Sequence, residues 1–213
     1  MNIYGRLVFR TYTTVPMNKN ILINLYVVKK LSSAEIAKKL NCSINKINYW
    51  LSIYKIQKRT ISEAIYQQHN PKGDPFLFNH PINQKEIFLF GLGLGLFWGE
   101  GSKRNIHSVR LSNSDPLLVK KFIEFLVNIY KIDKNKLRFQ LQTYDDLSVN
   151  KLLSFWAKHL SVKVTQFCKT TVLKRRGEGT YKNKMKYGVV VLYFSNMKLR
   201  NLLCSQIANI PSL

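Results

Sequence analysis

Apolar residues recur at helical spacing through the first third of the chain, between residues 19 and 59. This pattern predicts three short helices. Ser32 and Glu35 carry the sequence signature of a capping box at the start of the second helix, and Ser43 is expected to cap the third. The side chains expected to face inward are Ile36, Ala37 and Leu40 in the second helix and Ile44, Ile47 and Leu51 in the third. Residues 1–18 are expected to form an N-terminal arm.

The order of these residues, SxxEIAxxLxxSxxxIxxWL, resembles that of a helix-turn-helix DNA-binding unit. A small side chain at Ala37 lets the second helix pass close to the third. The resemblance implies a DNA-binding module over residues 19–66, with the third helix in the major groove. The residues expected to contact DNA are Asn45, Lys46, Asn48 and Tyr49. The alternative is a three-helix packing module with a solvated polar face.

Residues 67–84 contain several prolines and turn-forming residues, so we expect a linker there. The rest of the chain alternates between two periodicities. Helical spacing covers residues 87–99, 116–130, 147–160 and 197–207, and strand-like segments are 107–113, 137–143, 166–174 and 187–194. This order predicts an α+β domain over residues 85–213, with helices on one face of a mainly antiparallel sheet, preceded by a small all-α module.

Charge points to a polyanionic partner. The chain has 213 residues, with 34 Lys and Arg against 11 Asp and Glu, which gives a net charge of +23. Both the N-terminal and the C-terminal parts are basic. A small neutral substrate is disfavoured, and double-stranded DNA is the leading partner. An anionic membrane ranks second, and a generally basic, ribosome-associated protein stays open.

The three cysteines are far apart and form no CxxC pair, so neither a disulfide framework nor a zinc site is expected. The most apolar run, residues 87–99, is shorter than the about 20 residues that span a bilayer. We therefore expect a cytoplasmic protein without a membrane partner.

Glycines dominate residues 91–101, and three interpretations compete for this stretch. A dinucleotide-binding GxGxxG loop fails because Leu96 and Trp98 stand where its later glycines would be. A plain core helix fails because glycine costs about 1 kcal/mol per interior position. The third is a helix with a bare ridge, since Gly91, Gly95 and Gly99 recur every four residues and let another helix approach closely.

The segment LGLFWGEG, residues 94–101, resembles the end of the LAGLIDADG motif of homing endonucleases. Glu100 aligns with the final acidic residue of the motif, and the following GEGSK and VRLSNSDP segments are similar to those of single-motif members. The resemblance implies that two such helices pair and that the acidic residues bind Mg²⁺, or another divalent cation, at the cleavage centre. It assigns metal binding to Glu100 and Gly99, and the pairing interface to Gly91, Gly95, Leu96 and Gly99.

Because only one motif occurs, a two-carboxylate centre requires a homodimer, which predicts a pseudo-palindromic target. The implied activity is Mg²⁺-dependent hydrolysis of phosphodiester bonds in double-stranded DNA. Lys186 is the expected catalytic lysine. The remaining residues expected to contact DNA are Lys103, Arg104, Arg110, Arg138, Gln140 and Gln142, with Arg175, Arg176, Lys182 and Lys184 in a basic hairpin. Two alternatives remain: a non-catalytic transcriptional regulator with the same two modules, and an RNA-splicing maturase.

Overall fold

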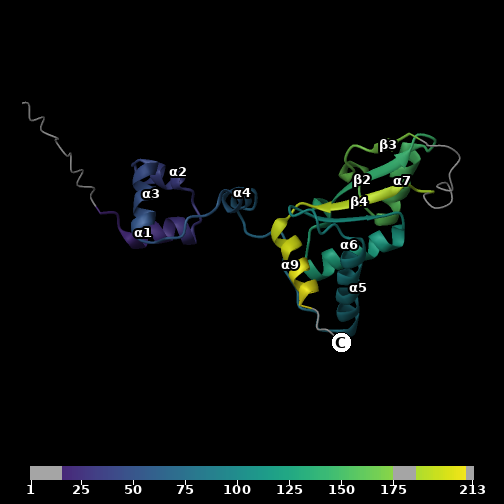
Figure 1. The fold of residues 1–213 in the computed structure, drawn as a ribbon, viewed down its shortest axis with the longest axis horizontal. Coiled ribbons are helices and arrows are strands. Elements are labelled where there is room, and N and C mark those ends of the chain that lie inside the picture. Colours follow the sequence, from purple (N-terminus) through teal and green to yellow (C-terminus); the bar gives the residue numbers. More distant parts are fainter. Residues whose placement is uncertain (1–15, 175–185, 210–213) are drawn as a thin grey trace, which may run out of the picture. The chain divides into compact units, whose positions relative to one another are not determined.

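The structure, a computed structural model, describes residues 16–174 and 186–209. The chain divides into two compact units, Met1–Gly73 and Asp74–Leu213, each with its own apolar core (Figure 1). The boundary lies inside the stretch predicted as a linker. Beyond it, Phe76 and Phe78 pack against the core of the second unit, and the Leu77 N–H donates to the Tyr130 carbonyl at 2.9 Å.

The first unit consists of short capped helices. They are α1 (Lys19–Ile23), continued by the π-helical η1 (Asn24–Val28), then α2 (Ser33–Lys39), α3 (Ile44–Ile53) and α4 (Ile61–His69). The Ser32 side chain accepts from the Glu35 N–H and the Glu35 carboxylate accepts from the Ser32 N–H, so the predicted capping box is confirmed. The Ser43 side chain caps α3 as predicted, accepting from the Lys46 N–H at 3.2 Å.

Helices α1, η1, α2 and α3 close over one small core. Ile36, Ile47 and Leu51 are fully buried and Ala37 nearly so, as the helical periodicity predicts. Ile44 is 47% exposed, so its predicted burial is wrong. It is the first residue of α3, and the buried stripe of this helix begins one turn later.

Helix α4 occupies residues that the sequence pattern placed at the end of the first module and the start of the linker. Thr60 and Glu63 form a second capping box, and no residue of α4 is buried. Arg59, just before it, donates through Nη1 to the Lys30 carbonyl at 2.7 Å and through Nη2 to the Leu31 carbonyl. The sequence does carry local signals for this helix, because Ile61, Ala64 and Ile65 recur at helical spacing after the Thr60 cap, but the predicted helices ended at residue 59.

The second unit is a mixed α+β structure, as predicted. Its order is α5 (Gln84–Glu100), β1 (Val109–Asn113), α6 (Pro116–Tyr130), η2 (Lys134–Lys136), β2 (Arg138–Tyr144), α7 (Val149–Leu160), η3 (Val164–Gln166), β3 (Thr171–Leu173), β4 (Val189–Phe194) and α9 (Met197–Ala208). Asp115 caps α6 and Pro116 takes its first position, an arrangement that needs no N–H from proline.

The four strands described form one sheet in the order β1-β4-β2-β3. Strand β4 is antiparallel to both β1 and β2, whereas β3 runs parallel to β2. The sheet is therefore mainly antiparallel, as predicted, with one parallel pair at this edge. Helix α7 connects β2 to β3, and a helical crossover returns the chain to the same end of the sheet, which makes the two strands parallel.

Helices cover one face of this sheet. Val109, Leu111, Phe139, Leu141 and Leu192 are fully buried, in a core shared with side chains from α5, α6, α7 and α9. In Figure 1 helices α5, α6 and α9 lie on the same side of the sheet. In the part of the chain that the structure describes, no helix combines the length and apolarity required to cross a bilayer.

Candidate nucleic-acid interface

Helix α5 has an exposed side on which its glycines line up with two large apolar residues. This surface, the glycine face, consists of Phe88, Gly91, Gly95, Trp98 and Gly99, which lie within about one third of the helix circumference. Phe88 is 70% exposed and Trp98 56%. A Cβ added at any of the three glycines would meet nothing within 4 Å. The helix therefore carries an apolar face that none of the described residues of its unit covers.

The fourth glycine of this stretch has a different role. A Cβ at Gly93 would lie 2.0 Å from the ring of Phe125, a fully buried residue of α6. Gly93 therefore allows α5 and α6 to pack closely inside the unit. Leu96, predicted at the pairing interface, is half-buried and packs partly against the core of its own unit.

Helix α5 ends on an exposed carboxylate. Glu100 is its last residue, and the Gly101 N–H caps the helix by donating to the Phe97 carbonyl at 3.0 Å. Lys103, predicted to contact DNA, donates its Nζ to the Trp98 carbonyl, and its own carbonyl accepts from Arg200 on α9. Lys103 thus stabilises the helix end, while Arg104 beside it is exposed.

The oxygens at this end suit a hard divalent cation. Among the described residues, neither the Glu100 carboxylate nor the Gly99 carbonyl takes part in a hydrogen bond or ion pair. A carboxylate at the C-terminus of a helix is disfavoured by the helix dipole, and a cation there reverses the sign of that interaction. Mg²⁺ binds through one or two carboxylates and completes its shell with water and phosphate oxygens, so this donor set fits it.

Lys186 lies elsewhere in the unit. Its Nζ is 5.4 Å from the centre of the Tyr187 ring, before the start of β4. Gly101 pairs with Leu111, which is in register with Leu192 near the far end of β4. The strand from Val189 to Leu192 alone spans about 10 Å. The structure therefore does not bring Lys186 to Glu100 of the same chain.

The sheet side opposite the helices carries the polar residues predicted from strand alternation. Register places Arg110 of β1 and Arg138 of β2 on either side of Tyr193 in β4, with Gln140 and Gln142 further along β2. We call this surface the outer sheet face; it consists of Arg110, Arg138, Gln140, Gln142, Thr171, Val191 and Tyr193. Arg138 donates to the Asn135 and Leu137 carbonyls at 2.7 and 2.9 Å, so its side chain is held at the edge of this face.

The sequence did not predict three residues of this region, Tyr193, Thr171 and Ser108. The Tyr193 hydroxyl donates to the Gln140 Oε1, and the Gln140 Nε2 donates to the Thr171 Oγ1 at 3.0 Å. The Ser108 Oγ accepts from the Arg110 Nε at 2.9 Å. Strand β4 reads VVVLYF, which shows no alternation of apolar and polar residues, so nothing in its sequence marks Tyr193 as outward-facing.

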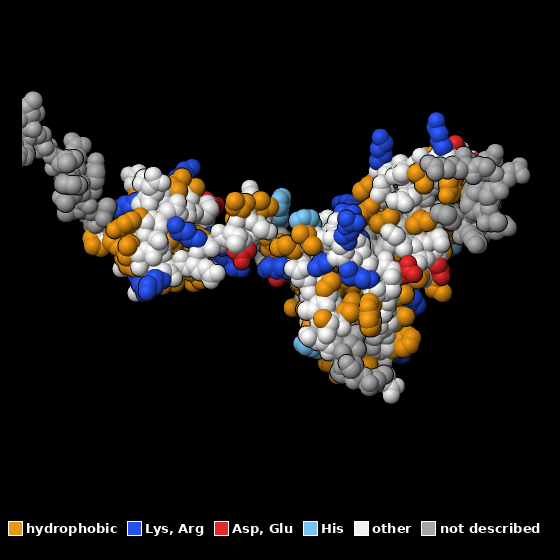
Figure 2. Space-filling model, viewed as in Figure 1, with side chains coloured by type: hydrophobic (Ala, Val, Ile, Leu, Met, Phe, Trp, Pro, Cys, Tyr) orange, Lys and Arg blue, Asp and Glu red, His pale blue; other side chains and the backbone are white. Residues whose placement is uncertain are grey.

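Helix α3 presents a second polar surface in the first unit. Asn45 and Tyr49 are exposed, and Lys46 is half-exposed beside them. Asn48 differs, because its Oδ1 accepts a hydrogen bond from the Ser33 hydroxyl at 3.1 Å, which ties α3 to the start of α2. Figure 2 shows Lys and Arg side chains on both units, with few acidic side chains among them.

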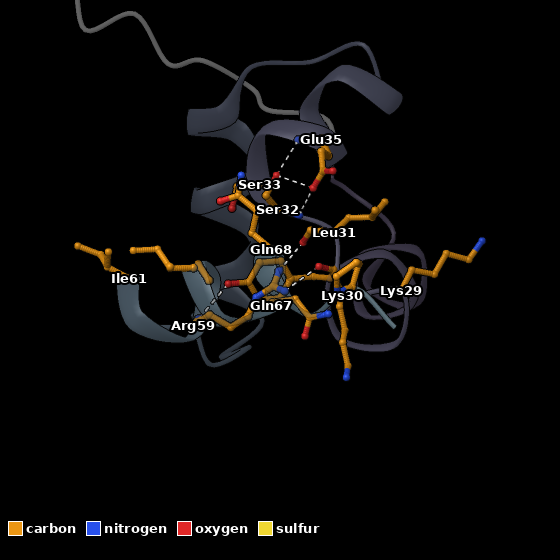
Figure 3. Close-up of a pocket in the computed structure, with 14 residues that line it drawn as sticks. Lys29, Lys30, Leu31, Ser32, Ser33, Glu35, Arg59, Ile61, Gln67 and Gln68 are labelled. Carbon is orange, nitrogen blue, oxygen red and sulfur yellow. Dashed lines mark hydrogen bonds between the residues drawn. The ribbon is translucent and has the colours of Figure 1, made fainter. Parts of the chain in front are cut away.

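A cleft of about 690 Å³ lies in the first unit between α4 and the start of α2. Its polar groups are already engaged: Arg59 binds backbone carbonyls and Glu35 closes the capping box (Figure 3). The ammonium groups of Lys29 and Lys30 point away from the other labelled side chains. The arginine and the carboxylate of this cleft therefore serve the fold of the first unit.

The basic hairpin residues Arg175, Arg176, Lys182 and Lys184 lie outside the described residues. No protein-family model, curated protein or solved structure matches the chain. The glycine face, the outer sheet face and α3 are the features of this chain that bear on its function.

Proposed function

We propose that this protein binds double-stranded DNA sequence-specifically as a homodimer and cleaves it with Mg²⁺. The observation that carries the proposal is the uncovered glycine face of α5, which leads to the exposed carboxylate of Glu100. A net charge of +23 supplies the long-range attraction to a polyanion. The outer sheet face supplies guanidinium and amide groups, which are the side chains that read base edges in the major groove.

A second copy of the chain is the occupant that suits the glycine face best. Phe88 and Trp98 project beyond a glycine ridge, so two such faces related by a two-fold axis offer each other knobs and hollows. Without side chains at Gly91 and Gly95, the two helix backbones can approach more closely than the usual 8–10 Å. We take the two-fold axis to run along the helices, since a parallel pair places the C-terminal ends of both α5 helices next to each other and an antiparallel pair would separate them.

At that junction Glu100 and the Gly99 carbonyl of each copy would hold Mg²⁺. The chemistry that such an ion would supply is neutralisation of charge on the scissile phosphate and activation of an attacking water. The proposal assigns Arg104 and Arg110 the role of holding flanking phosphates or bases in position. Lys186 is distant from Glu100 of its own chain, so only the Lys186 of the second copy could take part in proton transfer at that carboxylate. Phosphate binding is the simpler role for Lys186.

The first unit is proposed to act as a helix-turn-helix module. Its α2 and α3 are joined by the turn at Asn41, which has a positive φ of 48°, and α3 exposes Asn45 and Tyr49 on one face. Because α3 is capped at Ser43, its first turn is ordered where a recognition helix meets base edges. Two modules per chain would extend the target site and raise its specificity.

Selection of bound sites from random DNA duplexes, followed by incubation of the winner with Mg²⁺, tests the proposal. We expect a pseudo-palindromic site and cleavage near its centre. A bound but uncut duplex would identify a transcriptional regulator instead. Preference for structured RNA over the selected duplex at the same salt concentration would identify a maturase-like protein, and the absence of any sequence preference would refute specific DNA binding.

A further inference from the structure

Tyr193 occupies the centre of the outer sheet face. It is directly opposite Arg110 on one neighbouring strand and Arg138 on the other. Strands lie about 4.8 Å apart, so a side chain in this place can reach groups on both neighbours. Tyr193 contacts residues of both neighbouring strands, one with its hydroxyl and the other with its ring.

Its hydroxyl fixes the amide of Gln140. The Tyr193 O–H donates to Gln140 Oε1, and Gln140 Nε2 donates in turn to Thr171 Oγ1 at 3.0 Å. Both ends of the amide are therefore anchored, which fixes the position and plane of the amide on the outer sheet face. Each end can still make one more hydrogen bond, since the oxygen has a second lone pair and the nitrogen a second hydrogen. A donor and an acceptor side by side in one plane are what an adenine edge requires.

Its ring supports Arg110. The guanidinium carbon of Arg110 lies 4.9 Å from the centre of the Tyr193 ring, and its Nε donates to Ser108 Oγ at 2.9 Å. Among the described residues, the two terminal nitrogens of Arg110 donate no hydrogen bond. The Arg110 guanidinium is thus held in place through its Nε and its contact with the Tyr193 ring, while its two terminal nitrogens are available to bind guanine or phosphate.

The Tyr193 phenol is protonated at neutral pH, as any tyrosine with its ordinary pKa of about 10 is, and can therefore donate to Gln140. Desolvation raises this pKa further, against the opposing effect of the Arg110 charge.

We infer that Tyr193 is a positioning residue for sequence recognition: its hydroxyl orients the Gln140 amide and its ring supports Arg110, so that both read bases from the outer sheet face. This inference rests on the proposed function, because it concerns how that function discriminates sequences. Tyr193 itself need not touch a base.

The test compares the wild type with Tyr193→Phe, which keeps the ring and removes only the hydroxyl. Binding is measured without Mg²⁺ on the selected duplex and on all its single-base-pair variants. In the wild type, the base pair read by Gln140 is expected to show a discrimination of about 5- to 150-fold. In Tyr193→Phe this discrimination should fall by about 5-fold or more at that base pair, with binding to random duplex unchanged within about 2-fold.

Two further variants make the result specific. Thr171→Val removes the other anchor of the same amide and should relax the same base pair. Tyr187→Phe is the matched control, because its ring stacks on Phe155 in the same unit and its hydroxyl makes no hydrogen bond among the described residues. This control should leave the discrimination profile unchanged.

The free protein provides a readout that does not depend on DNA. The side-chain amide resonances of Gln140, assigned by their loss in Gln140→Leu, should shift and exchange faster with solvent in Tyr193→Phe than in the wild type. Unchanged resonances would overturn the inference. So would an unchanged discrimination profile in a wild type that does select a sequence, whereas a wild type with no sequence preference would overturn the proposed function as well.

Discussion

Replacing Gly95 by leucine should stabilise each subunit and dissociate the dimer. A Cβ at this position meets nothing within 4 Å, so the leucine is accommodated without strain in the single chain. Removing a glycine from an exposed helix interior lowers the free energy of the folded unit by about 0.8 kcal/mol. For a unit of this size the midpoint of thermal unfolding should rise by about 3 °C, when measured at concentrations where the protein is monomeric.

The dimer responds in the opposite direction. Two leucines, one from each copy, would enter a seam that depends on bare backbone. Overpacking costs about 1–3 kcal/mol per site, so two sites weaken dimerisation by about 2–6 kcal/mol. The dimer dissociation constant should therefore rise by a factor of about 30 to 10⁴. Sedimentation velocity over a series of protein concentrations measures this change directly.

Gly93→Ala is the matched control on the same helix. Its Cβ would lie 2.0 Å from the buried ring of Phe125, so this smaller substitution should lower the unfolding midpoint. A wild type that remains monomeric at tens of micromolar, or a Gly95→Leu variant that dimerises as tightly as the wild type, would refute the pairing through α5. A loss of thermal stability in Gly95→Leu would show that this glycine packs within its own unit.

Three other predictions test the remaining parts of the site. Glu100→Gln should bind the selected duplex within about 2-fold of wild-type affinity and abolish Mg²⁺-dependent cutting, and undiminished cutting would exclude this carboxylate as a metal ligand. DNA affinity should fall by about 10³-fold or more between 50 and 200 mM salt, as expected for about six phosphate contacts, and a flat response in a titration by fluorescence anisotropy would contradict an electrostatic interface. Hydrogen bonds from the Ser32 backbone N–H and hydroxyl hold the pKa of Glu35 below its ordinary value of 4.5. The contribution of this carboxylate to stability is therefore complete above about pH 4.5 and is lost as the pH falls through the lowered pKa. Hydrogen exchange of the α2 amides should therefore accelerate between pH 5 and pH 3 relative to the intrinsic rate, and Glu35→Gln, which cannot ionise, should lack this pH dependence.

Local signals along the chain were sufficient for most elements of secondary structure. Capping boxes, a proline after Asp115 and helical periodicity are properties of neighbouring residues, so the starts of α2, α3 and α6 could be predicted from sequence. The α+β character of the second unit followed from the order of helical and strand-like segments. Helix α4 was not predicted although it carries the same kind of local signals, a capping box at Thr60 and Glu63 and apolar residues at helical spacing.

In the candidate site, too, some features follow from neighbouring residues and others only from tertiary packing. The glycine spacing of α5 and the position of Glu100 are local, so the sequence alone determined them. Which glycine faces inward is decided by packing, since Gly93 contacts Phe125, 32 positions away in the chain, and Gly91 and Gly95 contact nothing. Pairing of β3 parallel to β2, and the place of Tyr193 between Arg110 and Arg138, depend on strand register. Register joins residues that are distant in sequence, and a strand such as VVVLYF carries no alternation that would set it in advance, so only the tertiary structure could decide what lies on the outer sheet face.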